Sequence, residues 1–137
     1  MSLCSVTCTL GLLSKEAPPR WPGHLLHGVM FRRLGEVDPA AAETAHAQEP
    51  RPFSISNLRR EGPHLVLRCA GLSDPVARAI GEAFEAGMEC EIGSSKVRVL
   101  DASVTRTDYG ELYEAHVPRE GACERISLRF SSPTTFR

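Results

Sequence analysis

The fold is decided by residues 64–87, HLVLRCAGLSDPVARAIGEAFEAG, because their apolar period changes midway. In the first half, Leu65, Leu67 and Cys69 occupy every second position, which is the period of a strand with one buried face. In the second half, apolar residues recur at every fourth position, which is the period of a helix with one apolar face. This stretch therefore predicts a strand followed directly by an amphipathic helix.

The predicted helix spans residues 74–86. Ser73 or Asp74 provides the N-cap, and Pro75 suits the first turn because its missing N–H would have no partner there. Gly87 is expected to mark the end of the helix. The apolar face consists of Val76, Ile80 and Phe84.

The N-terminal part of the chain predicts another strand and another helix. The strand is indicated by apolar residues at alternate positions, which are Cys4, Val6, Cys8 and Leu10. The helix is expected over residues 22–34 and should end near Gly35. Its apolar stripe is Leu25, Leu26, Val29, Met30 and Leu34.

Two shorter elements are expected between that helix and the strand predicted over residues 64–70. Asp38 and Pro39 have N-cap and first-turn chemistry, so a short helix is predicted over residues 40–46. Residues 53–56 alternate in polarity and should form a hairpin-like unit with residues 64–70, joined through a Gly-Pro turn.

The C-terminal part predicts a hairpin and one further strand. Residues 88–92 and 96–104 flank a turn that begins at Gly93. Residues 126–130 alternate again, whereas residues 106–123 show no clear pattern. The complete order predicts an α+β fold of the ferredoxin-like (RRM-like) βαββαβ kind, an antiparallel sheet with two helices on one face and an extra β-hairpin.

Length and composition predict one soluble domain over residues 1–137. Hydrophobic residues make up 42% of the chain and charged residues 24%, and no apolar run approaches the ~20 residues of a membrane span. The first residues lack a basic region, so we expect a cytoplasmic protein with no membrane partner. The net charge of −1 means that any contact with RNA must come from a local basic patch. The clustered candidates for this patch are Arg32, Arg33, Arg51, Arg59 and Arg60.

The cysteines predict no metal site and no cofactor. There are five of them, at positions 4, 8, 69, 90 and 123, without any CxxC pair, and most fall at apolar positions of predicted strands. They are therefore interpreted as small buried hydrophobic residues. Cys4 and Cys8 with His24 and His27 would be a conceivable zinc set, but their spacing matches no zinc-finger pattern.

Four segments, in order along nearly the whole chain, resemble the CRISPR-associated endoribonucleases that cut the repeat RNA of CRISPR transcripts, members of the RAMP superfamily. Residues 25–56, LLHGVMFRRLGEVDPAAAETAHAQEPRPFSIS, contain the first two: a helix with a Leu-x-Gly element, and an Asp-Pro segment that ends in histidine before a basic-x-Phe-Ser-x-Ser strand. Residues 70–80, AGLSDPVARAI, and residues 128–137, LRFSSPTTFR, are similar to the family's later elements.

The resemblance implies cleavage of CRISPR repeat RNA without a metal, by attack of a ribose 2′-hydroxyl that leaves a cyclic phosphate. His46 matches the family's histidine, which would accept or donate a proton. Arg51 matches a basic position that would stabilise negative charge in the transition state. Arg32, Arg33, Arg59 and Arg60 are the expected RNA-binding residues, and other CRISPR-associated proteins are further expected partners.

The sequence also departs from the family. Phe31 stands where some members have a tyrosine that shares the proton transfer, and His27, one helical turn earlier, is expected to take over that role. Family members usually have a second ferredoxin-like domain with a Gly-rich loop, so residues 1–137 are expected to be the N-terminal half of such a protein, with the second half absent.

Three functions remain open on the sequence. The first is this endoribonuclease, or its N-terminal domain. The second is a non-catalytic RNA-binding or assembly module of the same superfamily, and the third is a small ferredoxin-like ligand-binding or dimerisation domain. RNA recognition of the RRM kind, with bases stacked on the central strands, is disfavoured because residues 64–70 contain no aromatic residue.

Overall fold

The computed structural model describes residues 1–116, so the predicted strand over residues 126–130 and Cys123 lie outside the described residues. Six strands and four helices are present in this part of the chain. The strands are β1 (Ser2–Leu12), β2 (Phe53–Ile55), β3 (Arg59–Glu61), β4 (His64–Gly71), β5 (Glu89–Ile92) and β6 (Ser95–Asp108). The helices are α1 (Gly23–Val37), α2 (Pro39–Ala47), α3 (Asp74–Ala83) and α4 (Tyr109–His116).

The strands form one antiparallel sheet in the order β2-β4-β1-β6-β5, and β3 pairs with the start of β4. This confirms the ferredoxin-like prediction, since β1, α1, β2, β4, α3 and β6 make the βαββαβ unit. The predicted hairpin is present as β5 and β6. Its longer arm, β6, is the strand that pairs with β1.

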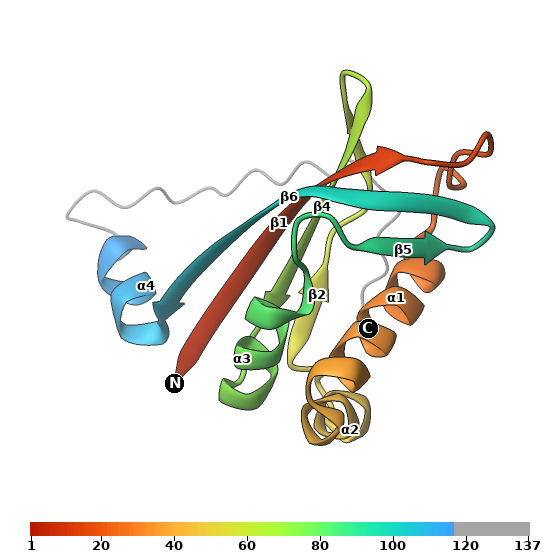
Figure 1. The fold of residues 1–137 in the computed structure, drawn as a ribbon. Coiled ribbons are helices and arrows are strands. Elements are labelled where there is room, and N and C mark those ends of the chain that lie inside the picture. The colour runs from red at the N-terminus through yellow and green to blue at the C-terminus, as the bar shows by residue number, and fades with distance from the viewer. Residues whose placement is uncertain (117–137) are drawn as a thin grey trace.

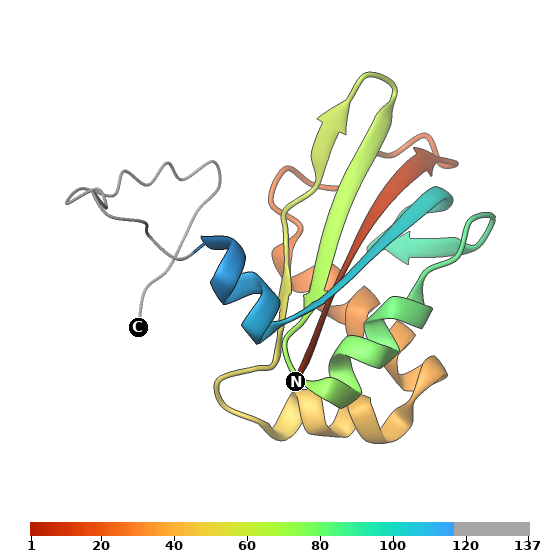
Figure 2. The same cartoon turned by 90° about the vertical axis from the view of Figure 1, so that its left-hand side faces the viewer.

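The helices α1, α2 and α3 lie together on one side of the sheet, and α4 lies beyond the end of β6 (Figures 1 and 2). The alternation in β1 is the reason for this one-sided packing. Its apolar residues are buried against the helices, and these are Cys4, Val6, Cys8 and Leu10. The residues between them, Ser5, Thr7 and Thr9, are only partly buried and lie on the opposite face.

Helix α1 continues past Gly35 to Val37, two residues beyond the expected end. Gly35 has no positive φ, so it does not end the helix as a C-cap glycine would. The helix ends instead at Asp38, because a residue before proline is disfavoured in the helical region and Asp38 has φ −149° and ψ 95°. The Asp38 carboxylate then caps α2 as predicted, accepting hydrogen bonds from the N–H groups of Ala40 and Ala41, both at 3.1 Å.

Helix α3 ends at Ala83, earlier than the predicted residue 86, and Gly87 does not mark its end. Phe84 adopts an extended conformation, with φ −128° and ψ 128°, and its ring is buried in the core. Gly87 has φ +93° and lies in the turn before β5, where its N–H donates to the carbonyl of Val99 at 2.7 Å. The need to bury Phe84 therefore decides where the helix stops.

The thiols behave as buried hydrophobic groups, as predicted. Cys4, Cys8 and Cys69 are buried and Cys90 is partly buried. Burial raises the pKa of Cys8 to about 12, so its thiol stays protonated at neutral pH. None of the helices in residues 1–116 is long and apolar enough to cross a membrane.

We expect Gly71→Ala to destabilise the domain, because α3 packs directly on β4 at this position. A Cβ on Gly71 would lie 2.5 Å from the Cα of Ala77, so helix and strand would have to separate. Overpacking of this kind costs about 1–3 kcal/mol. Urea denaturation monitored by circular dichroism measures the change. The control is Gly28→Ala on α1, where an added Cβ meets nothing within 4 Å, and an equal loss of stability in both variants would contradict the packing argument.

Candidate functional site

The structure brings the three predicted catalytic residues together. His27 lies on α1, His46 in the last turn of α2, and Arg51 in the connection that leads into β2. They surround two aromatic rings, Phe31 of α1 and Phe53 of β2. We call these five residues the Phe31 cluster.

The rings of the cluster pack edge to face. Phe31 and Phe53 have centroids 5.3 Å apart at an interplanar angle of 89°. His46 packs on Phe31 at 5.5 Å and 85°, and His27 packs on Phe53 at 5.5 Å and 61°. The Cζ atom of Arg51 lies 5.8 Å from the centroid of Phe31, within the range of a cation–π contact. Such aromatic pairs have preferred geometries, so the packing orients both imidazoles.

Local structure explains why these residues meet. His27 and Phe31 are four residues apart on α1 and therefore share one helical face. The corner at Asp38 turns the chain directly from α1 into α2, so that the end of α2 returns beside α1. Strand β2 begins at Phe53, which is the aromatic position of the basic-x-Phe motif. The sequence predicts no role in the site for this residue.

The electrostatic environment favours a neutral His27. Burial, and secondly the positive charge of Arg51, lower the pKa of His27 from its ordinary value, so the imidazole is neutral at neutral pH. Neither His27 nor His46 makes a side-chain hydrogen bond within residues 1–116. A substrate can therefore use the ring nitrogens of either residue.

Phe31 has a structural role at the centre of the cluster. Its ring contacts His46, Phe53 and the Arg51 guanidinium, so it joins α1 to α2 and to β2. The ring carries no proton to transfer. It supports the groups that can transfer one.

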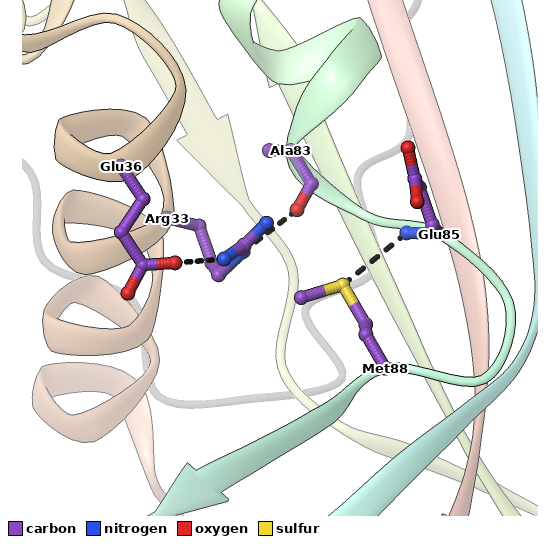
Figure 3. Close-up of polar contacts among 5 residues, drawn as sticks. All are labelled: Arg33, Glu36, Ala83, Glu85 and Met88. Carbon is purple, nitrogen blue, oxygen red and sulfur yellow. Dashed lines mark hydrogen bonds and ion pairs between the residues drawn. The ribbon is translucent and has the colours of Figure 1, made fainter.

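Arg33, which the sequence predicts to bind RNA, makes two contacts within the protein. Its Nε–H donates to the carbonyl oxygen of Ala83 at 2.8 Å, and its guanidinium forms an ion pair with Glu36 (Figure 3). Ala83 is the last residue of α3, so Arg33 attaches α1 to the C-terminal end of that helix. In the turn that follows, the N–H of Glu85 donates to the sulfur of Met88 at 3.2 Å (Figure 3).

The other predicted RNA-binding arginines lie at separate places outside the Phe31 cluster. Arg32 is exposed on α1 and lines a hollow with Glu89 and Glu91 of β5. Arg59 is exposed on β3, where it pairs with Glu61, and Arg60 follows it on the same short strand.

The conceivable zinc ligands do not converge. Cys4 and Cys8 are buried under the helices, whereas His24 and His27 line a hollow between the start of α1 and the end of β2. Among residues 1–116, no three histidine, cysteine, aspartate or glutamate side chains form a group that could hold a metal ion.

Several solved structures resemble this chain. Thermus thermophilus Cas6 in a product complex aligns with a TM-score of 0.55 at 28% identity, over 73% of this chain and 40% of that one. A RAMP protein binding different RNA substrates has a TM-score of 0.59 at 16% identity, over 74% and 48% of the two chains. The product of a Cas6-related gene from Pyrococcus furiosus has a TM-score of 0.63 at 15% identity, over 77% and 49%. No protein-family profile and no curated protein matches the sequence.

These similarities confirm the predicted ferredoxin-like fold class and the predicted resemblance to CRISPR-associated RAMP proteins. The chain has the ferredoxin-like fold that these Cas6 and RAMP proteins share. Among the solved structures described, it is similar to a Cas6 protein at 28% identity. It spans less than half the length of each of the three proteins described.

We expect Arg51→Gln to raise the pKa of His27, because removing the neighbouring cation makes the imidazolium less unfavourable. The pKa should remain below the ordinary value, since burial is the larger cause of the shift. NMR titration of the imidazole C–H signals measures the change. Arg60→Gln, on β3 and outside the cluster, is the matched control. A His27 pKa that responds equally to both substitutions, or to neither, would contradict the described geometry.

Proposed function

We propose that this chain is the N-terminal domain of a CRISPR repeat-RNA endoribonuclease and that the Phe31 cluster is its catalytic site. The observation that carries the proposal is the convergence of His27, His46 and Arg51, which lie on three separate segments of the chain. The similarity to Cas6 and RAMP proteins supports RNA as the substrate.

The two histidines suit the two proton transfers of the reaction. His27, neutral because of its lowered pKa, accepts the proton of the attacking ribose 2′-hydroxyl. The new O–P bond forms the cyclic phosphate, and the bond to the 5′-oxygen of the next nucleotide breaks. His46 in its protonated form gives a proton to that leaving oxygen.

Arg51 supplies the charge that the reaction needs. The phosphorus becomes five-coordinate in the transition state, and its equatorial oxygens gain negative charge. A guanidinium presents several N–H donors in one plane, which allows it to hold two of these oxygens together. The cation–π contact with Phe31 favours one position of the Arg51 guanidinium while leaving its N–H groups available.

A second candidate is a non-catalytic RNA-binding or assembly module of the same superfamily. Phe31 favours it, because the position where some family members have a proton-donating tyrosine here carries a phenyl ring. In that case the Phe31 cluster would hold RNA without cutting it, and other CRISPR-associated proteins would be its partners.

His46→Ala should slow cleavage of a repeat RNA by about 10²- to 10⁴-fold, the usual contribution of general acid–base catalysis. The assay is cleavage of end-labelled repeat RNA in excess chelator under single-turnover conditions. His116→Ala is the matched control, because it removes an exposed histidine on α4 and should leave the rate unchanged.

Two further results bear on the same mechanism. An RNA with a 2′-deoxyribose at the cleaved position should not react, since it lacks the nucleophile. Cleavage that survives this substitution, requires Mg²⁺ or is unaffected by His46→Ala would reject the mechanism. An RNA that binds the wild-type chain and is never cut would favour the non-catalytic module.

Phe31→Tyr tests whether His27 has replaced the missing tyrosine. If it has, the variant should cleave within about threefold of the wild-type rate, whereas His27→Ala should lose about 10²- to 10⁴-fold. The same single-turnover assay measures both. A large gain in the tyrosine variant, with little loss in His27→Ala, would show that the proton donor at position 31 is what the wild-type site lacks.

A further inference from the structure

A hollow of about 330 Å³ lies directly beside the Phe31 cluster, and His27 lines both. On one side it is bordered by Trp21 and by the start of α1 at Gly23, and on the other by the end of β2 and by Asn57. None of its lining residues is acidic. We call it the Trp21 hollow.

Trp21 is placed as an exposed aromatic surface. Its side chain is 44% exposed, although Pro22 beside it is fully buried. The Arg20 guanidinium lies over the indole, with Cζ 5.2 Å from the ring centroid. The Asn57 carboxamide donates to the carbonyl oxygen of Arg20 at 3.5 Å, which links this segment to the connection after β2. The indole is therefore held at the rim of the hollow while much of its surface remains available.

We propose that the Trp21 hollow binds one unpaired nucleobase of the RNA, next to the phosphate that is cleaved, with the base stacked on the indole. This inference rests on the proposed function, because it takes RNA as the substrate of the Phe31 cluster. The Phe31 cluster acts on the ribose and the phosphate, and the Trp21 hollow would add recognition of an unstacked base.

The chemistry of the hollow fits a nucleobase better than a peptide side chain. Every base has a π-face that stacks on an aromatic ring, and a nearby guanidinium can hold the phosphate of the same nucleotide. Asn57 makes no other side-chain hydrogen bond within residues 1–116, so its amide groups can pair with the edge of a base. The volume lies at the lower end of the range for small-ligand sites, which suits one base and not a folded partner.

His27 explains why the bound base would be adjacent to the reacting phosphate. The residue is shared by the hollow and the cluster, so a nucleotide whose base enters the hollow has its ribose and phosphate next to the imidazole. Holding the base outside a helical stack also gives the 2′-hydroxyl the freedom to align with the phosphate it attacks.

The chain has a single tryptophan, so its intrinsic fluorescence reports on Trp21 alone. We expect a short single-stranded oligoribonucleotide spanning the cleaved position, with a 2′-deoxyribose there to prevent reaction, to quench this fluorescence. The same RNA made abasic at the nucleotide beside that phosphate should bind without quenching, and more weakly.

Trp21→Ala should raise the Kd for this RNA about 10- to 100-fold, measured by fluorescence anisotropy of labelled RNA, whereas Trp21→Phe should retain most of the affinity. Tyr113→Ala removes another exposed aromatic ring, on α4, and is the matched control. Gly23→Gln adds a side chain at the wall of the hollow, where an added Cβ meets nothing within 4 Å, and it should also weaken binding. Thermal unfolding of each variant checks that the fold is retained.

The outcomes separate this inference from the proposed function. If the wild-type chain cuts the RNA but the RNA does not quench Trp21, or if Trp21→Ala binds the RNA with the wild-type Kd, the base-binding proposal is rejected and the proposed nuclease activity is supported. If the RNA quenches the Trp21 fluorescence but is never cut, the base-binding proposal is supported and the proposed nuclease activity is rejected. Quenching by the abasic RNA equal to that by the intact RNA, or by an acidic peptide and not by RNA, rejects base stacking.

Discussion

The molecule depends on the pairing of β1 along both of its edges. Because β4 and β6 are both antiparallel to it, the register commits each β1 side chain to one face of the sheet, and a slip of one residue would exchange the faces. Only one face is apolar, so α1, α2 and α3 all pack there (Figure 1). The edge strand β2 is joined to the sheet through β4 alone, and it is at this edge that helices and strand meet to form the candidate site.

Aromatic packing, and not a network of hydrogen bonds, positions the two histidines. His46 rests on Phe31 and His27 on Phe53, while the two phenyl rings pack against each other. The separation of the imidazoles is thus set by the attachment of α1 and α2 to β2. An arrangement of this kind leaves the imidazole nitrogens without hydrogen-bond partners in residues 1–116, and it makes the site sensitive to any change that moves α1 against the sheet. Arg33, bound to the end of α3, is one of the groups that prevent such movement.

Patterns with a local cause could be predicted from the sequence, and those with a tertiary cause could not. The alternation of β1, the capped start of α2 and the β5–β6 hairpin follow from neighbouring residues, and all are present. The end of α3 was misplaced because the burial of Phe84 overrides a glycine signal three residues later. Strand β3 has only three residues, all exposed, and helix α4 buries none of its residues, so neither has an apolar pattern to recognise. Within the site, the resemblance predicts His46 and Arg51, and helical spacing from Phe31 predicts His27.

The contact of His27 with Phe53 could not be predicted, because it depends on how α1 packs against β2 and no local pattern determines that packing.

Some of the described arginines are paired with carboxylates and others lie over aromatic rings, and this difference bears on how a domain of net charge −1 would hold RNA. Arg33, Arg59, Arg78 and Arg98 form ion pairs with neighbouring carboxylates, so much of their charge is already compensated. Arg51 and Arg20 instead lie over the aromatic rings of Phe31 and Trp21, where no carboxylate is paired with them in the described residues. A ring attracts a cation weakly and leaves its N–H edge unbonded, whereas a carboxylate occupies that edge. Arg51 therefore places positive charge beside His27 and His46 that no carboxylate in the described residues offsets, and this charge would attract a phosphate to the Phe31 cluster.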